Sequence, residues 1–371
     1  MVKIRESSPR LLVNLEAIQQ NYLYAKQRVP KAVAAAVIKA NAYGLKDHFV
    51  ADALHKVGCQ DFFVTNLLEG EALRQRIGSA PHVYILHGIE DGDEAIYDAL
   101  NLIPVLNTSG DLSAWIKYAK KHEKRLPALL KINSGMNRLG FAPDELKSLP
   151  FAEIQKHLSL KYILSHLACG NDPTNSMNAR QLSLFQELTN TYFPGIPRSL
   201  AASSILSLPL EYALDMTRLG ICLYGGYAGK KEGVPPLKFA LSLQARILEI
   251  IELAQGDSVG YNARYVAKTP RRIATIGIGY ADGLHLSLSG QLIKVRVGQF
   301  EAPIIGEISM DMASIDITDI PPAVAHRNTW VDLFYDNMSS YNIVKHCGSS
   351  LHELLVRMGM RCNRVYMTGA I

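Results

Sequence analysis

The stretch AVAAAVIKANAYGL, residues 32–45, gives the clearest indication of the fold. It begins with a run of small and branched apolar residues at 33–38, which is followed at once by Lys39 and the sequence ANAYG. Short apolar runs with polar or glycine boundaries are typical of parallel strands that are buried on both faces. Residues 33–38 are therefore predicted to form a buried strand that ends next to Lys39.

Seven further runs of the same kind follow, and stretches with helical periodicity separate them. The predicted strands are residues 62–65, 82–86, 103–106, 128–132, 162–165, 199–202 and 218–223. The predicted helices are residues 48–57, 69–76, 93–100, 112–121, 143–157 and 179–191. A repeated strand–helix alternation with eight strands predicts an α/β fold, a (β/α)8 TIM-like barrel over residues 8–228.

The pattern changes after Gly225. The segment GKKEGVPP, residues 229–236, has the composition of a linker. Beyond it the apolar runs are separated by turns, and one clear helix is expected at 350–358. These features predict a mostly β C-terminal domain of residues 237–371, to which we also assign residues 1–7. Its predicted strands are residues 241–251, 273–278, 292–297, 300–305, 313–317 and 330–333.

Composition excludes several classes of protein. Of 371 residues, 48% are hydrophobic and 20% are charged, which excludes intrinsic disorder and allows a large core. The 39 basic and 34 acidic residues leave a net charge of only +5, scattered along the chain, so we do not expect a nucleic-acid partner. No metal-binding motif such as HExxH is present, so no metal site is expected.

The cysteines and the N-terminus indicate a cytoplasmic protein. The five cysteines are far apart and form no CxxC pair, which favours reduced thiols. The N-terminal sequence MVKIRESSPR has charges where a signal peptide would have an apolar stretch. The longest apolar run, at 32–38, is far too short to span a membrane, so no membrane partner is expected.

Two reactive side chains lie at the predicted strands, since Lys39 directly follows the first strand and Arg218 is the first residue of the last one. Side chains at the C-terminal ends of barrel strands line the active site. Lys39 would be partly desolvated there, which lowers the pKa of an amine and makes it nucleophilic. Arg218 precedes Gly220, Gly225 and Gly226 and could accompany a phosphate site made by backbone N–H groups. Each of these residues, taken alone, also fits an ordinary strand-end or turn residue.

Three more candidates have the same ambiguity. Arg138 lies in a glycine-containing loop after a predicted strand, and His166 lies just past another strand. Tyr280 follows an apolar strand of the second domain, and it could act as an acid or a base if a neighbouring positive charge lowered its pKa. Taken alone, Arg138 could equally be an ordinary surface residue and His166 a structural or solvated histidine. Tyr280 could equally be an aromatic residue at the end of a strand.

Five motifs together resemble the alanine racemase family over almost the whole chain. They occur in the order of the family: VIKANAYG (37–44), KINSGMNRLG (131–140), TRLGICLYG (217–225), IGIGYADG (276–283) and GEISMDM (306–312). The resemblance implies a barrel that binds pyridoxal 5'-phosphate, followed by a β domain. It also implies a homodimeric isomerase that interconverts L-alanine and D-alanine, the latter used for peptidoglycan.

The resemblance also implies roles for individual residues. Lys39 would form a Schiff base with the cofactor and act as one catalytic base, and Tyr280 of the partner subunit would be the opposite base. Arg218 would bind the pyridine nitrogen, and His166 would lie against the ring. Arg138 would contact the phenolic oxygen of the cofactor ring, next to the substrate, and the backbone of Met310 would bind the substrate carboxylate. The phosphate would be bound by Tyr43, Ser203, Tyr366 and the backbone of Gly220 and Ile221.

The chain departs from the family pattern at several positions. Ser199 and Ala202 occupy positions where the family usually has His and Asn, GYNARY at 260–265 differs from the usual sequence, and Asn363 replaces a usual Pro. These departures leave alternatives open. One is a racemase of broader specificity for serine, lysine or arginine, and another is a pyridoxal-phosphate-binding protein without catalytic activity. A decarboxylase with this architecture is a further alternative, but it would normally have a catalytic cysteine in the β domain, and neither Cys347 nor Cys362 lies in such a motif.

Overall fold

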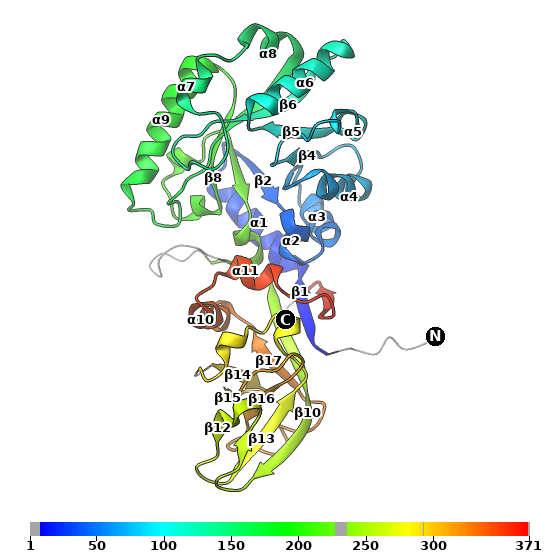
Figure 1. The fold of residues 1–371 in the computed structure, drawn as a ribbon, viewed down its shortest axis with the longest axis vertical. Helices are drawn as coiled ribbons and strands as arrows, with labels where there is room; N and C mark the ends of the chain where they lie inside the picture. The colour runs from blue at the N-terminus through cyan, green and yellow to red at the C-terminus, as the bar shows by residue number, and fades with distance from the viewer. Residues whose placement is uncertain (1–7, 227–235, 292, 370–371) are drawn as a thin grey trace. The chain divides into compact units, whose positions relative to one another are not determined.

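The computed structural model describes residues 8–226, 236–291 and 293–369 (Figure 1). The described parts of Ile18–Lys238 form one compact unit, and those of Met1–Ala17 and Phe239–Ile371 form the other. The predicted linker at 229–236 lies outside the described residues except for Pro236.

The first unit is a closed barrel of parallel strands, which confirms the predicted fold. Within the described residues the barrel closes where β9 pairs with β2 in parallel, with Val33 opposite Met216. Six of the predicted runs lie within two residues of the observed strands at both ends. The run at 162–165 belongs to a strand that already begins at Leu158, and the run at 218–223 extends four residues past the end of its strand at Leu219. The strands are β2 (Val33–Val37), β3 (Asp61–Val64), β4 (His82–Ile85), β5 (Leu102–Leu106), β6 (Leu126–Lys131), β7 (Leu158–Leu164), β8 (Arg198–Ala202) and β9 (Met216–Leu219).

Helices run along the outside of these strands (Figure 1). The predicted helix at 143–157 is in fact two helices, because the first ends at Leu146 and Pro150, which cannot continue a helix, directly precedes the second. The last strand ends earlier than predicted, since Gly220 begins the short 3₁₀ turn η3 (Ile221–Tyr224). The helices are α1 (Leu15–Arg28), α2 (Lys39–Tyr43), α3 (Asp47–Lys56), α4 (Leu67–Ile77), α5 (Glu94–Ala99), α6 (Ser109–Lys121), α7 (Pro143–Leu146), α8 (Phe151–His157) and α9 (Ser176–Tyr192).

Side chains fill the interior of the barrel. Phe63 and Tyr84 stack with ring centroids 4.6 Å apart. Because the interior is packed, a ligand can reach reacting groups only at the ends of the strands. The buried cluster contains Ala35, Phe63, Tyr84, Ile103, Val105, Leu129, Leu164 and Met216.

The second unit is built on a mostly antiparallel sheet, as predicted. Among the described residues, its strand order is β13-β16-β15-β14-β17-β10-β1-β18. Two short strands, β11 (Ser258–Val259) and β12 (Tyr265–Val266), pair with each other and fall between β10 and β13 in the sequence. The main strands are β1 (Arg10–Asn14), β10 (Leu241–Leu253), β13 (Arg271–Ile276), β14 (Lys294–Val297), β15 (Phe300–Ile305), β16 (Ala313–Asp316), β17 (Trp330–Phe334) and β18 (Asn363–Met367).

Two features of this unit differ from the sequence-based expectation. Residues 8–17, which we placed at the start of the barrel, belong to the second unit, because β1 pairs antiparallel with β10 and parallel with β18. The helical segment is also longer than predicted, since α10 (Asn337–Cys347) precedes α11 (Leu351–Val356). The carboxylate of Asp336 caps α10 by accepting the N–H of Ser339 at 2.7 Å.

In the described ranges, none of the helices combines the length and the apolar character needed to cross a membrane.

Candidate active site

Lys39 begins a strained turn at the C-terminal end of β2. The four residues that follow it, 40–43, all have left-handed backbone conformation, with φ between 53° and 56°. This conformation costs roughly 1–2 kcal/mol for each residue other than glycine, so tertiary contacts must hold it. Glu69 supplies one of these contacts, because its carboxylate accepts the N–H of Ala40 at 2.6 Å. The same carboxylate accepts the N–H of Thr65 at 2.7 Å, which ties the turn to the end of β3. The turn therefore holds the backbone of Lys39 in a fixed place.

The surroundings of Lys39 favour its neutral, nucleophilic form. Desolvation by the surrounding residues lowers the pKa of its ammonium group, and the positive charge of Arg138 lowers it further. Glu69 opposes the shift, but it is the smallest of the three influences. An amine with a lowered pKa is the form that adds to a carbonyl group.

Two more basic side chains, Lys131 and His166, lie at the same strand ends. Lys131 is the last residue of β6, and burial together with the charges of Arg218, Arg138 and Lys39 lowers its pKa to about 8. Burial and the same cations lower the pKa of His166 to about 3, so its imidazole is neutral. The charges that shift these two groups are all positive. A site of this kind favours an anionic ligand.

Arg218 is a buried cation that is held by neutral acceptors. Only 5% of the residue is exposed, and its burial lowers the pKa of the guanidinium to about 10. Its Nη1 donates to the hydroxyl of Ser199, which itself donates to the carbonyl of Met216 at 2.8 Å. Within the described part of the chain, its Nε–H has no hydrogen-bond partner. Arg218 therefore keeps its charged Nε–H available as a donor to a ligand atom.

The other terminal nitrogen of Arg218 bonds to the segment after β7 and to β8. Nη2 donates to the carbonyl of Ser165 at 2.6 Å and to the carbonyl of Leu200 at 3.1 Å. It also lies 3.1 Å from Nδ1 of His166. Nη2 has two hydrogens, so its three neighbours share them. Because a guanidinium can only donate, Nδ1 of His166 is an acceptor, and the ring proton is on Nε2.

Tyr43, Ser203 and Gly220 form a small cradle beside these groups. The Ser203 hydroxyl accepts the N–H of Gly220 at 2.9 Å and that of Cys222 at 3.3 Å. A Cβ at position 220 would lie 2.5 Å from the Tyr43 hydroxyl, so only glycine leaves room there. The ring of Tyr43 packs on that of Tyr224, with centroids 5.0 Å apart. Two hydroxyls and the start of η3 at Ile221 suit a phosphate group.

The remaining predicted site residues lie in the second unit. The N–H of Tyr280 donates to the carbonyl of Ser309, and that of Ala281 donates to the carbonyl of Met310, both at 3.1 Å. The structure therefore brings Tyr280 and Met310 together, and 44% of Tyr280 is exposed. Tyr366 lies in β18, in register with Val13 of β1.

The turn that carries Tyr280 is held by ion pairs. Asp282 is only 1% exposed and accepts the N–H of Gly279 at 3.0 Å. Arg361 pairs with this carboxylate at 2.7 Å and also with Asp311. Tyr280 is thus an exposed phenol on a fixed turn.

Sequence reasoning missed Glu69 and the part played by Ser199. The signal for Glu69 was present, because Asn66 and Glu69 have the spacing of a helix-capping box directly after a predicted strand. Asn66 does cap α4, but the glutamate binds N–H groups at two strand ends instead. The resemblance singled out Ser199 only as a departure from a usual His, and it did not predict that the serine hydroxyl itself bonds to Arg218.

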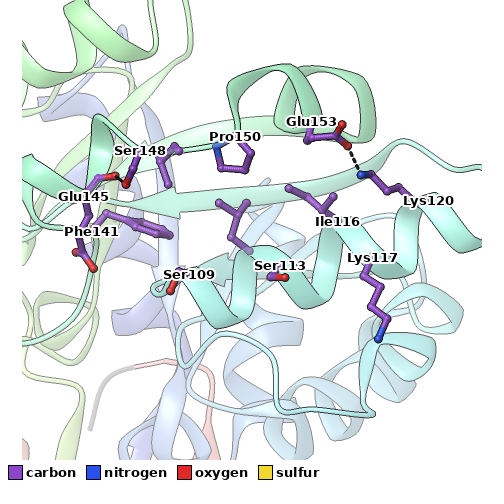
Figure 2. A pocket seen from close by; sticks show the side chains of 12 residues that line it. Ser109, Ser113, Ile116, Lys117, Lys120, Phe141, Glu145, Ser148, Pro150 and Glu153 are labelled. Atoms are coloured by element: carbon purple, nitrogen blue, oxygen red, sulfur yellow. Dashed lines mark hydrogen bonds and ion pairs between the residues drawn. The ribbon is translucent and has the colours of Figure 1, made fainter.

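A cavity of about 620 Å³ lies elsewhere in the first unit, between α6 and the segment 141–153 (Figure 2). The predicted site residues are not among those that line it. Three of its four charged groups are already engaged, since Lys120 pairs with Glu153 and Glu145 accepts the N–H of Ala142 at 2.6 Å. In Figure 2 the side chain of Lys117 points away from the space. We assign no chemistry to it.

Among the residues that the structure describes, no three His, Cys, Asp or Glu side chains are placed to hold a metal ion.

Comparison with known proteins gives consistent matches. The family model of the alanine racemase N-terminal domain matches residues 13–228, and that of the C-terminal domain matches residues 240–366. The alanine racemase of Rhizobium meliloti (strain 1021) is 36% identical over 375 residues, which cover 98% of each chain.

Solved structures agree with this match. Alanine racemase from Bartonella henselae, with covalently bound pyridoxal phosphate, has a TM-score of 0.91 at 33% identity and covers 97% of this chain and 100% of its own. Biosynthetic alanine racemase from Pseudomonas aeruginosa has a TM-score of 0.87 at 33% identity, with 97% and 99% covered.

Proposed function

The chain belongs to the alanine racemase family, and from this premise we propose that it interconverts L-alanine and D-alanine with pyridoxal 5'-phosphate as its cofactor. One observation carries the proposal. A lysine amine with a lowered pKa, a two-hydroxyl cradle and an unpaired guanidinium N–H lie at the same end of one barrel. The catalytic and binding roles that follow belong to the same proposal.

The residues at the barrel mouth fit this cofactor. The hydroxyls of Tyr43 and Ser203 and the backbone at Gly220 and Ile221 would hold its phosphate, together with Tyr366. The missing Cβ at Gly220 supports this assignment, because an added carbon would displace the Tyr43 hydroxyl. Lys39 would be the residue to which the aldehyde is attached. When bound, the cofactor supplies an electron sink that acidifies the α-proton of the substrate.

Arg218 and His166 would set the polarity of the cofactor ring. The pKa of Arg218 is about 10, so the guanidinium stays protonated at neutral pH and donates to the ring nitrogen. A ring nitrogen that accepts this bond is disfavoured from taking a proton, which weakens the electron sink and limits side reactions such as transamination. The neutral imidazole of His166 would lie against the ring without adding charge.

Racemisation requires a proton to leave one face of the substrate and another to arrive at the opposite face. Lys39 would serve one face, and Tyr280 of the partner subunit would serve the other. Arg138 would contact the phenolic oxygen of the ring, and the backbone of Met310 would bind the substrate carboxylate. The surface around Tyr280 supports a homodimer, because Met310 and Met312 are about half exposed beside it. D-alanine formed in the cytoplasm would supply peptidoglycan.

The activity is tested directly by incubating the purified protein with pyridoxal phosphate and L-alanine, followed by chiral chromatography. We expect D-alanine to appear until both enantiomers are equal. A panel of L-serine, L-lysine and L-arginine decides the broader specificity, and we expect alanine to be preferred. Absence of enantiomer exchange with every amino acid would reject the proposal.

The shared active site is tested with two inactive variants, Lys39→Ala and Tyr280→Phe. Each homodimer should be inactive. A heterodimer purified with two affinity tags should regain about half the activity of the wild type, since one of its two symmetric sites would then contain both intact residues. An inactive heterodimer, or an active Tyr280→Phe homodimer, would contradict the assignment of Tyr280 to the partner subunit.

A further inference from the structure

Gln181 is a buried polar side chain that none of the roles above uses. It lies in α9 and is 0% exposed. Its Oε1 accepts the N–H of Ala168 at 2.8 Å, and its Nε2 donates to the carbonyl of His166 at 2.9 Å. A buried amide is costly unless it is hydrogen-bonded, and this one is bonded through both ends. It therefore fixes the main chain on both sides of Leu167.

The same side chain reaches a second loop of the site. Its Nε2 lies 3.5 Å from the hydroxyl of Ser134, which is itself 2.7 Å from the hydroxyl of Ser165. The backbone at Gly135 packs closely on α9, since a Cβ there would lie 2.9 Å from the methyl carbon of Met177. Ser134 and Gly135 belong to the loop that follows β6 and contains Arg138. Gln181 thus connects the loops that follow β6 and β7.

The segment that Gln181 holds is the segment that holds Arg218. Two of the acceptors around Arg218 are the carbonyl of Ser165, at 2.6 Å, and Nδ1 of His166, at 3.1 Å. We propose that Gln181 is a positioning residue that sets the imidazole of His166 and the guanidinium of Arg218 against the cofactor ring. This inference rests on the proposed function, because the ring is that of pyridoxal phosphate.

Replacement of the amide separates positioning from simple packing. Gln181→Met keeps the length of the side chain and removes its hydrogen bonds. Gln181→Glu keeps the shape and an acceptor for Ala168, but as a carboxylate it cannot donate to the carbonyl of His166. Gln186→Met is the matched control, because it makes the same change in the same helix at a side chain without a hydrogen bond among the described residues.

The first measurement is the ¹⁵N spectrum of His166 in the full-length protein, with and without pyridoxal phosphate. The wild type should show one tautomer with the proton on Nε2, because the guanidinium donates to Nδ1. In Gln181→Met and Gln181→Glu the bond should loosen, and the two ring nitrogens should move toward an average of both tautomers. Gln186→Met should keep the wild-type signals.

The second measurement is steady-state kinetics of the holoenzyme with alanine. A displacement of about 1 Å in a group that orients the reaction can cost on the order of 100-fold in rate, so we expect kcat of both Gln181 variants to fall about 10- to 100-fold. The KM for alanine should change less than about threefold, because Gln181 lies among residues that would face the cofactor ring and not the substrate carboxylate.

The outcomes are distinct. Loss of the single tautomer together with the fall in kcat supports the inference. Gln181 variants that keep the wild-type His166 signals and keep kcat within about twofold would overturn it, even if their melting temperature falls. If Gln181→Met does not fold, Gln181→Glu decides by the same two measurements. A wild type that binds no pyridoxal phosphate would instead reject the proposed function, while the spectrum of the cofactor-free protein would still test the role of Gln181.

Discussion

Replacing Gly220 with alanine would place a Cβ atom 2.5 Å from the hydroxyl oxygen of Tyr43. Ordinary contact between these atoms needs about 3.5 Å, so the hydroxyl would have to move by about 1 Å. Tyr43 is 7% exposed and packs on Tyr224, which leaves it little room to move. The backbone of Gly220 has a negative φ of −122°, so the collision and not a left-handed conformation is the source of the effect.

The collision should weaken cofactor binding measurably. Overpacking of this kind typically costs about 1–3 kcal/mol. If the phosphate cradle bears this cost only when the cofactor is bound in place, the Kd for pyridoxal phosphate should rise about 5- to 150-fold. The assay is an absorbance titration of the cofactor-free protein. Gly110→Ala is the matched control. Gly110 lies on α6, and a Cβ added there would be 3.5 Å from the nearest atom, Oγ1 of Thr108, which is an ordinary contact.

The Tyr43→Phe background shows whether the hydroxyl is responsible. Without that hydroxyl the collision disappears, so Gly220→Ala should cost much less there than in the wild type. A Gly220→Ala protein that binds the cofactor like the wild type, or one that loses as much affinity in the Tyr43→Phe background, would refute this reasoning about the cradle.

Three other changes test separate parts of the structure. Arg74→Met should lower the free energy of unfolding by about 2–4 kcal/mol in urea denaturation, because buried Arg74 donates to four backbone carbonyls; a loss below about 1 kcal/mol would show that these bonds matter little. Tyr280→Phe should lower kcat about 100- to 10,000-fold and leave the absorbance of the bound cofactor unchanged, and persistent turnover would exclude Tyr280 as a base. In the cofactor-free protein, stability should fall as the pH drops below the unfolded pKa of 6.5 for His166, because the folded pKa of about 3 keeps the folded state from taking up the proton. Between pH 7 and pH 5 the free energy of unfolding should fall by about 2 kcal/mol from this residue, and His166→Gln should not show this part of the loss. Equal acid sensitivity of the two proteins would contradict the assignment of a buried, neutral imidazole.

The barrel could be predicted from the sequence because each of its strands has a local signature. A strand that is buried on both faces must be apolar throughout. A polar residue at its C-terminal end therefore stands out in the sequence, and in a barrel that end lies at the active site. That rule singled out Lys39 and His166 before any contact was known, whereas Arg218 was singled out by the glycines that follow it. The structure places all three at the same end of the barrel. The contact between the last two, at 3.1 Å, follows from β7 and β9 both flanking β8.

Features that depend on distant partners were not predictable. Alanine has no preference for left-handed backbone, so the turn at 40–43 arises from contacts such as those of Glu69 and not from its own residues. The strand β1 pairs with residues more than 200 positions away, and no short-range pattern specifies that register. The serine hydroxyl beside Arg218 is visible as a residue in the sequence, but its bond depends on how β8 and β9 pair.

The central claim is that one amine at the mouth of the barrel holds the cofactor. Borohydride reduction of the protein loaded with pyridoxal phosphate, followed by peptide mapping, tests this claim most directly. The account predicts a coloured protein whose visible absorbance band disappears on reduction, with the cofactor label on the peptide that contains Lys39. A colourless protein that takes up no cofactor when it is supplied in excess, or a label on any other lysine, would contradict it.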